Sequence, residues 1–316
     1  MTTDTVTDVL IVGGGYAGLS AASTLYRATH STIVFDSNIF RDNLAPQIRL
    51  LPGFEGASSD RYREVARTEL EKTGLCSFVN SEVTEVEKIE NGLWKLTTED
   101  GNNWLGKKII LATGVDEIYP DIAGYEDCWV TGIFPCLFQF GYEERDVESA
   151  GILVVNKLAQ HLPQVVKLAG DANKFARNVN LYTNGDREVT ANLEPLVQGT
   201  NFRIRDCPIR RLVKQKNRAE VVVELDDDTV ITEGFLVHQP YTKLRGQLPE
   251  RLGLEMTPFG DIKVQHPFPA TSVPGIYAAG DCASPFKNAS MAIAAGVCAG
   301  NGVARELPGS LEIEVQ

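Results

Sequence analysis

The sequence contains few of the residues that hold metal ions. There are four histidines and six cysteines among 316 residues. No two cysteines are spaced as Cys-x-x-Cys, and none pairs with a histidine at the spacing of zinc ligands. These absences argue against a zinc site. We expect a chain without a bound metal whose cysteines are reduced thiols, as is usual in the cytoplasm.

The chain also lacks a basic excess, a secretory leader and a long apolar run. Its net charge of -12 argues against a nucleic acid or an anionic membrane as partner, because phosphate groups attract basic surfaces. The first apolar run, residues 9–12, is too short for a signal peptide. Residues 289–304 are rich in small residues but are interrupted by Gly296, Gly300 and Asn301, which favours a packed helix over a membrane span.

An apolar segment at the start of the chain runs directly into a glycine-rich turn. Residues 8–18 read DVLIVGGGYAG, and a second predicted strand ends on Asp36. In such a motif Gly13 permits the tight turn, Gly15 lets the backbone approach a pyrophosphate, and Gly18 allows close helix–strand packing. The motif predicts a dinucleotide-binding unit whose helix N-terminus holds the phosphates. Asp36 is placed to hydrogen-bond a ribose hydroxyl. The predicted contacts of the turn are Gly13, Gly15, Tyr16, Ala17 and Gly18.

Two further motifs show which dinucleotide is expected. Residues 108–114 form an apolar run that ends in Ala-Thr-Gly, and residues 271–281 end in Gly-Asp. In this order the three motifs resemble the low-molecular-weight thioredoxin reductases. The resemblance implies an α/β fold of two Rossmann-like domains, bound FAD and a homodimer. It implies a discontinuous FAD domain (residues 1–117 and 241–316) around an inserted domain (residues 118–240). The implied FAD contacts are Thr113, Gly114, Gly280 and Asp281.

Within this superfamily the chain is most similar to the gliotoxin-oxidoreductase-like dithiol oxidases of fungal biosynthesis. Residues 40–56 resemble the segment that follows the second strand in that group, and Arg41 fits its pattern. Asp42 and Gln47 stand where asparagine and histidine are expected. The resemblance implies that Arg41 and Gln47 contact the cofactor. It also suggests a small secondary metabolite as substrate.

The segment that should carry the redox disulfide is altered. It reads Cys136-Leu137-Phe138-Gln139, so glutamine replaces the second cysteine. Glutamine forms hydrogen bonds but cannot form a thiolate or a disulfide. A two-electron relay through a dithiol within this segment is therefore excluded. Cys136 is either a single nucleophile, which would need an activating base, or a small packed side chain.

The inserted domain lacks the glycine motif that a nicotinamide nucleotide needs. After the apolar run at residues 151–155, the three small residues are replaced by Asn156, Leu158 and His161. Side chains at these positions would fill the space of a pyrophosphate. Residues 178–185 also lack the arginines that bind a 2′-phosphate in reductases of this group. The sequence therefore predicts that this domain does not bind NADPH.

Together these features predict an FAD oxidase or dehydrogenase that takes two electrons directly from a small organic molecule, with molecular oxygen as acceptor. His238 lies where the chain should return to the FAD domain, and a pKa of about 6.5 would suit a general base. Gln139 could orient the substrate, Tyr142 could present a hydroxyl, and Cys136 stays a candidate. The other candidate functions are a thiol oxidase that uses Cys136 alone, an NAD(P)H-dependent flavin reductase with an atypical site, and a flavin-binding protein without catalysis.

Overall fold

The computed structural model describes residues 2–308 and divides into two compact units. Within the described chain, the first unit comprises residues 2–43, 51–116 and 243–308, and the second comprises residues 44–50 and 117–242. The expected domain boundaries left residues 44–50 in the FAD domain. Contacts instead group this short segment with the inserted unit, and Ala45 packs against the core of that unit.

The first unit is built on a mainly parallel sheet with the strand order β3-β2-β1-β6-β5-β4, and β17 pairs with β6. The central strands are parallel, whereas β4, β5 and β6 are joined antiparallel. The strands are β1 (Thr2–Val12), β2 (Thr32–Phe35), β3 (Cys76–Val79), β4 (Val83–Lys88), β5 (Trp94–Thr98), β6 (Asn103–Leu111) and β17 (Ile276–Ala278).

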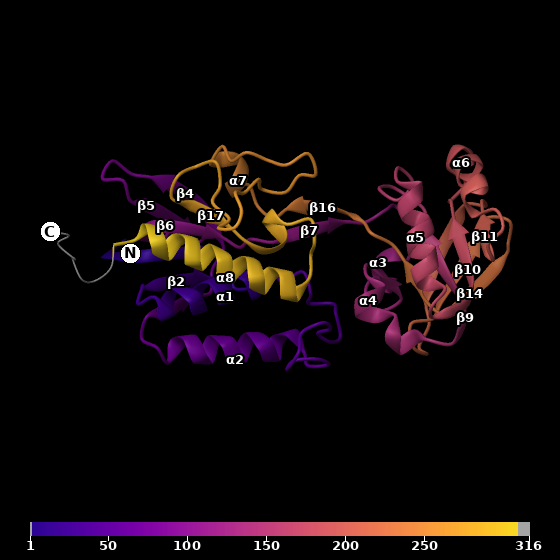
Figure 1. The fold of residues 1–316 in the computed structure, drawn as a ribbon, viewed down its shortest axis with the longest axis horizontal. Coiled ribbons are helices and arrows are strands. Elements are labelled where there is room, and N and C mark those ends of the chain that lie inside the picture. The colour runs from indigo at the N-terminus through magenta and orange to yellow at the C-terminus, as the bar shows by residue number, and fades with distance from the viewer. Residues whose placement is uncertain (1, 309–316) are drawn as a thin grey trace. The chain divides into compact units, whose positions relative to one another are not determined.

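Residues 9–12 of β1 are buried on both faces of the sheet, as their unbroken apolar sequence predicts. Val9 and Ile11 face one core, and Leu10 and Val12 face the other. The helices of the first core are α1 (Tyr16–Arg27), α2 (Ser59–Glu71) and α8 (Ala289–Glu306). Figure 1 shows α8 running alongside α1, with α2 on the opposite side of α1. No helix in residues 2–308 combines the length and the hydropathy needed to cross a bilayer.

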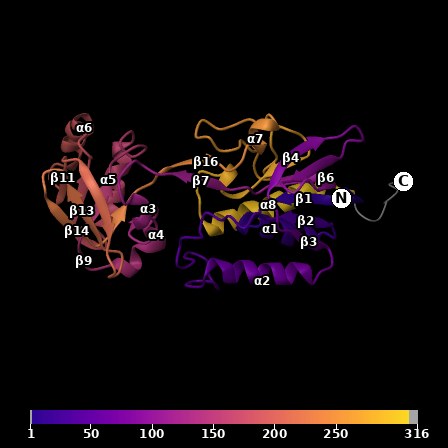
Figure 2. The same cartoon turned by 180° about the vertical axis from the view of Figure 1, so that it is seen from behind.

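The second unit has three layers. Its five-stranded parallel sheet has the order β11-β10-β9-β15-β8. Helices α5 and α6 cover one face, in front in Figure 1, and a three-stranded antiparallel sheet covers the other, in front in Figure 2. The elements are β8 (Ile133–Phe134), β9 (Val147–Leu153), α5 (Leu162–Ala172), β10 (Ala176–Tyr182), α6 (Arg187–Val197), β11 (Phe202–Arg205), β12 (Ile209–Lys214), β13 (Val221–Leu225), β14 (Val230–Glu233) and β15 (Leu236–Val237).

The remaining elements are short. Strands β7 (Val115–Ile118) and β16 (Tyr241–Leu244) pair as a two-stranded sheet where the chain passes from one unit to the other. The short helices are α3 (Tyr125–Cys128), α4 (Leu137–Phe140), η1 (Tyr142–Glu144), α7 (Leu248–Arg251) and η2 (Gly280–Ala283).

Candidate functional site

The glycine turn between β1 and α1 is packed tightly, and two of its glycines, Gly13 and Gly18, have no room for a side chain. Gly13 has φ 115°, and a Cβ there would overlap the carbonyl oxygen of Ala112. A Cβ at Gly18 would overlap the carbonyl oxygen of Gly13. The Gly13 amide donates to the carbonyl of Phe35 over 2.8 Å. The helix and the strand therefore approach as closely as the sequence predicts for a phosphate-binding turn.

The N-terminus of α1 is open toward a ligand. Gly15 is the N-cap residue and provides no side-chain cap. No heavy atom lies within 4 Å of the position that a Cβ on Gly15 would take. The first amides of a helix, here those of Tyr16 and Ala17, have no intrahelical acceptor and carry the positive end of the helix dipole. This arrangement fits a bound pyrophosphate.

Asp36 lies beside this turn at the end of β2. Its side chain is almost fully buried and lies directly against Gly14, where any side chain would overlap the carboxylate. Its Oδ1 accepts from the amide of Asn38 over 2.9 Å, and its Oδ2 is 3.2 Å from Nη1 of Arg67. The carboxylate is thus fixed next to the glycine turn, where a ribose hydroxyl would reach it.

The three sequence motifs meet at the carboxyl ends of three neighbouring strands. Strand β6 lies between β1 and β17, so Ala-Thr-Gly lies between the other two motifs. Gly280 has φ 82°, and a Cβ there would lie 2.8 Å from the Cβ of Ala17. The hydroxyl of Thr113 is buried, and among the described residues it has only a weak interaction with the thiol of Cys282. Gly114, which follows it, has φ 70°.

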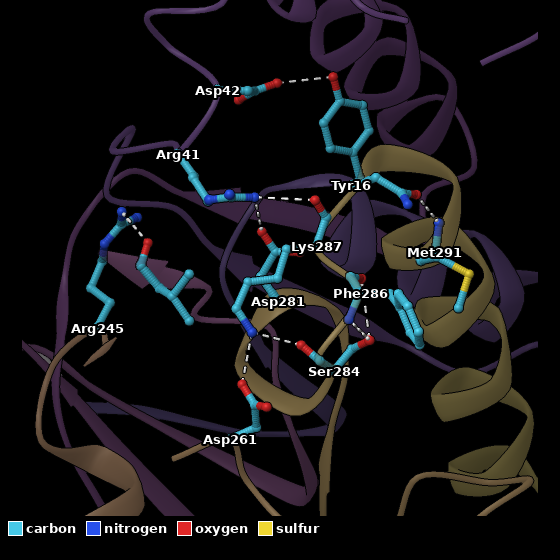
Figure 3. Close-up of polar contacts among 12 residues, drawn as sticks. Tyr16, Arg41, Asp42, Arg245, Asp261, Asp281, Ser284, Phe286, Lys287 and Met291 are labelled. Atoms are coloured by element: carbon cyan, nitrogen blue, oxygen red, sulfur yellow. Dashed lines mark hydrogen bonds and ion pairs between the residues drawn. The ribbon is translucent and has the colours of Figure 1, made fainter. Parts of the chain in front are cut away.

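An ion-pair cluster surrounds the Gly-Asp motif (Figure 3). Nη1 of Arg41 donates to Oδ2 of Asp281 and to the carbonyl of Lys287, each over 3.2 Å. Burial raises the pKa of Asp281, and the charges of Arg41 and Lys287 oppose that rise. Nζ of Lys287 in turn donates to Oδ1 of Asp261 over 2.7 Å and to the carbonyl of Ser284 over 2.6 Å.

Sequence reasoning missed Lys287 and Asp261. The only local signal was the position of Lys287 a few residues after the Gly-Asp motif.

The comparisons with known proteins agree with this geometry. A family model described as pyridine nucleotide-disulphide oxidoreductase matches residues 7–296. The chain belongs to this family. It is 37% identical to "Thioredoxin reductase sirT" of Leptosphaeria maculans, over 96% of this chain and 94% of the relative. It is also 37% identical to "Thioredoxin reductase aclD" of Aspergillus oryzae, over 95% and 96%.

Solved structures give the same fold. An oxidoreductase from Agrobacterium tumefaciens superposes with a TM-score of 0.85 at 28% identity, over 96% of this chain and 98% of that one. The protein HlmI gives a TM-score of 0.86 at 23% identity, over 97% and 94%, which shows the fold alone. The predicted thioredoxin reductase-like α/β fold, the enzyme class of oxidoreductase and the FAD cofactor are confirmed. The open N-terminus of α1, the Thr113 hydroxyl and the turn lined by glycines fit FAD.

The second unit of this pyridine nucleotide-disulphide oxidoreductase family member has a different βα turn. The turn between β9 and α5 comprises residues 154–161. The corresponding turn of the first unit, between β1 and α1, comprises only residues 13–15. Leu158 is buried in the core, and Pro163 stands in the first turn of α5 and has no amide hydrogen. The amides of residues 158, 160, 161, 164 and 165 all donate to carbonyls of the same turn. The amides of residues 158, 160 and 161 are therefore already bonded within the turn, and Pro163 has no amide hydrogen to offer.

Three of the four predicted catalytic residues, Cys136, Gln139 and His238, lie on segments that directly follow β8 and β15. These strands are parallel neighbours, and the amide of His238 donates to the carbonyl of Phe134 over 3.2 Å. Nε2 of Gln239 donates to the carbonyl of Pro135 over 3.4 Å. The segments that carry Cys136 and His238 thus lie side by side. Cys136 is the half-buried N-cap residue of α4, and Gln139 lies within that helix.

His238, the predicted general base, lies in a buried environment. Its side chain is fully buried, and Nδ1 shares a hydrogen bond of 2.7 Å with the Tyr125 hydroxyl. Burial lowers the pKa of His238 to about 4, and only the backbone of Val155 favours the charged form. Nε2 makes no well-formed hydrogen bond within residues 2–308. The surrounding rings exclude water from the imidazole, and a role of His238 as the general base stays a prediction.

Two other predicted residues lie on the surface of the second unit. Tyr142 is 65% exposed, and the Arg145 guanidinium lies 4.2 Å from the centre of its ring. Gln47 is exposed, and its Oε1 accepts from Nη2 of Arg49 over 2.6 Å. Arg49 also pairs with Glu143 over 2.8 Å. Gln47 is thus grouped with the second unit rather than with the glycine turn.

Proposed function

We propose that this chain is an FAD-dependent oxidase or dehydrogenase that takes two electrons directly from a small organic substrate and passes them to molecular oxygen. The observation that carries the proposal is the turn between β9 and α5. The amides of residues 158, 160 and 161 are bonded within this turn, and Leu158 anchors it in the core, which disfavours binding of the pyrophosphate of NADPH there.

The altered redox segment supports the same electron route. Gln139 stands where a second cysteine would be needed, and an amide cannot carry electrons as a thiolate or a disulfide can. Bound FAD supplies the two-electron acceptor that no side chain of this segment provides. The substrate then loses two electrons and two protons, and molecular oxygen gains them as hydrogen peroxide.

The residues of the two units have different tasks in this proposal. The glycine turn, Thr113 and the Arg41–Asp281 pair bind the cofactor and fix its position. Gln139 orients the substrate through its amide, and Tyr142 offers an exposed hydroxyl to the same substrate. The sequence resemblance supports a secondary metabolite as substrate and a homodimer, and the free cysteines support a cytoplasmic location.

Anaerobic reduction of the bound flavin tests the proposal. NADPH, dithiols and candidate metabolites are mixed separately with the holoenzyme under nitrogen, and the flavin absorbance near 450 nm is followed. We expect a metabolite to bleach the flavin, air to restore it, and NADPH to leave it oxidised. Rapid bleaching by NADPH alone would instead establish a reductase with an atypical nucleotide site.

A thiol oxidase that uses Cys136 alone is the second candidate. The observation in its favour is that this thiol is free and half-buried, so a substrate can reach it. The variant Cys136→Ser separates the two functions. Direct electron transfer predicts turnover close to that of the parent enzyme, whereas a thiol oxidase would lose activity entirely.

A further inference from the structure

Asp42 joins the loop after β2 to two helices, and Figure 3 shows its contact with Tyr16 of the first of them. Its Oδ2 accepts from the Tyr16 hydroxyl of α1 over 2.9 Å, and its Oδ1 accepts from Nη1 of Arg63 of α2 over 3.0 Å. Both carboxylate oxygens are thus used. An asparagine, which the sequence resemblance placed here, has a single acceptor oxygen and could not serve both donors in this way.

Arg63 is a rigid anchor for this loop. Its side chain is only 7% exposed, and Nη2 donates to Oγ of Ser59 over 3.0 Å and to Oδ1 of Asp60 over 2.7 Å. The same guanidinium lies 3.8 Å from the centre of the Phe40 ring. Arg63 therefore holds Phe40 and Asp42, the residues on either side of Arg41.

The Arg41 side chain extends toward the Gly-Asp motif. In Figure 3 the Asp42 side chain is directed toward Tyr16, whereas the Arg41 side chain is directed toward Asp281. The guanidinium of Arg41 bonds both the Asp281 carboxylate and the carbonyl of Lys287, next to the Gly-Asp motif. The residues before and after Arg41 are thus both held by Arg63, while the guanidinium of Arg41 is held at the Gly-Asp motif.

We propose that Asp42 is a positioning residue for the flavin: held by Tyr16 and Arg63, it directs Arg41 to Asp281 and thereby strengthens FAD binding. The inference rests on the flavin site of the proposed function and not on its electron route. Asp42 itself needs no contact with FAD.

The sign of the effect separates positioning from simple electrostatics. Asp42 is close enough to Asp281 for its negative charge to act on that carboxyl. The pyrophosphate of FAD is also negative, so removal of the Asp42 charge should by itself tighten FAD binding. A positioning role predicts weaker binding, because an unanchored Arg41 loses its fixed direction.

The test measures the dissociation constant of FAD from deflavinated protein by fluorescence titration. We expect Asp42→Ala to weaken FAD binding about tenfold, the size of one charge-assisted hydrogen bond. The effect should vanish when Arg41→Ala is already present, because Asp42 acts through Arg41. The matched control is Asp60→Ala, which removes another partner of Arg63 but leaves the loop bonded, and it should change affinity by less than about twofold.

Three results would overturn the inference. The first is unchanged or tighter FAD binding by Asp42→Ala. The others are a loss of FAD affinity that is the same with arginine or alanine at position 41, or an equal loss of affinity in the control Asp60→Ala. If Asp42→Ala does not fold, Tyr16→Phe decides in its place. That variant removes only the hydroxyl, and we expect about threefold weaker binding that again requires Arg41. A failure of the proposed electron route would leave these affinities unchanged.

Discussion

The carbonyl oxygen of Gly13 occupies the place where a side chain on Gly18 would begin, so these two glycines set how closely α1 approaches β1. Gly15, between them, faces open space and has an ordinary φ of -77°. Gly13 and Gly18 are therefore glycines because the fold leaves no room for a side chain there. Gly15 is a glycine because the ligand needs the space.

This difference predicts opposite outcomes for two similar variants. Gly18→Ala should destabilise the apoprotein by about 1–3 kcal/mol, because the new methyl group overlaps backbone that cannot move cheaply. Gly15→Ala should leave the stability of the apoprotein close to that of the parent and weaken FAD binding more than about tenfold, because its methyl group enters the space of the phosphates. Urea unfolding of the apoprotein and FAD titration measure the two effects. Equal behaviour of both variants would contradict the assignment.

The ion pair of Lys287 and Asp261 is buried, and its loss should be costly. Both side chains are about nine-tenths buried, with Nζ and Oδ1 2.7 Å apart. Lys287→Met leaves the Asp261 carboxylate buried and unpaired, which should lower the free energy of unfolding by about 3 kcal/mol. The control is Lys263→Met. Lys263 pairs with Glu255 at a similar distance on the surface, so its loss should cost less than about 1 kcal/mol. Chemical denaturation compares the two.

His238 should make the stability of the protein depend on pH. Its pKa is about 4 in the folded chain and about 6.5 when unfolded, so the unfolded state binds more protons between these values. The contribution of His238 to the free energy of unfolding is fully present above about pH 6.5. It falls by about 3 kcal/mol in all as the pH drops toward 4.

The variant His238→Gln should therefore lose stability at neutral pH but show a flatter profile from pH 6.5 to 4. His161, an exposed histidine at the N-cap of α5, supplies the control His161→Gln. We expect the profile of this control to follow the parent. Denaturant unfolding at several pH values gives the slope of the free energy of unfolding against pH. Parallel curves for His238→Gln and the parent would exclude the buried imidazole as the cause of the pH dependence.

The sequence predicted the glycine turn well because each glycine there has a local reason that can be recognised along the chain. The surroundings of His238 could not be predicted in this way. Its partner Tyr125 lies 113 positions earlier, and the burial of the pair depends on the packing of several strands. The partner of Lys287 depends equally on the tertiary fold, since nothing near Asp261 in the sequence marks it as a buried carboxylate.

Leu158 offers a test of why the second unit lacks a nucleotide cradle. If its side chain is core rather than a relic at a binding site, Leu158→Ala should lower the free energy of unfolding by about 2–4 kcal/mol. The exposed neighbour Lys157 supplies the control Lys157→Ala, with an expected change below about 0.5 kcal/mol. Neither variant should acquire NADPH binding, because the amides of the turn stay bonded to its own carbonyls. Saturable NADPH binding by Leu158→Ala, measured by calorimetry, would show that one side chain alone had closed a working site.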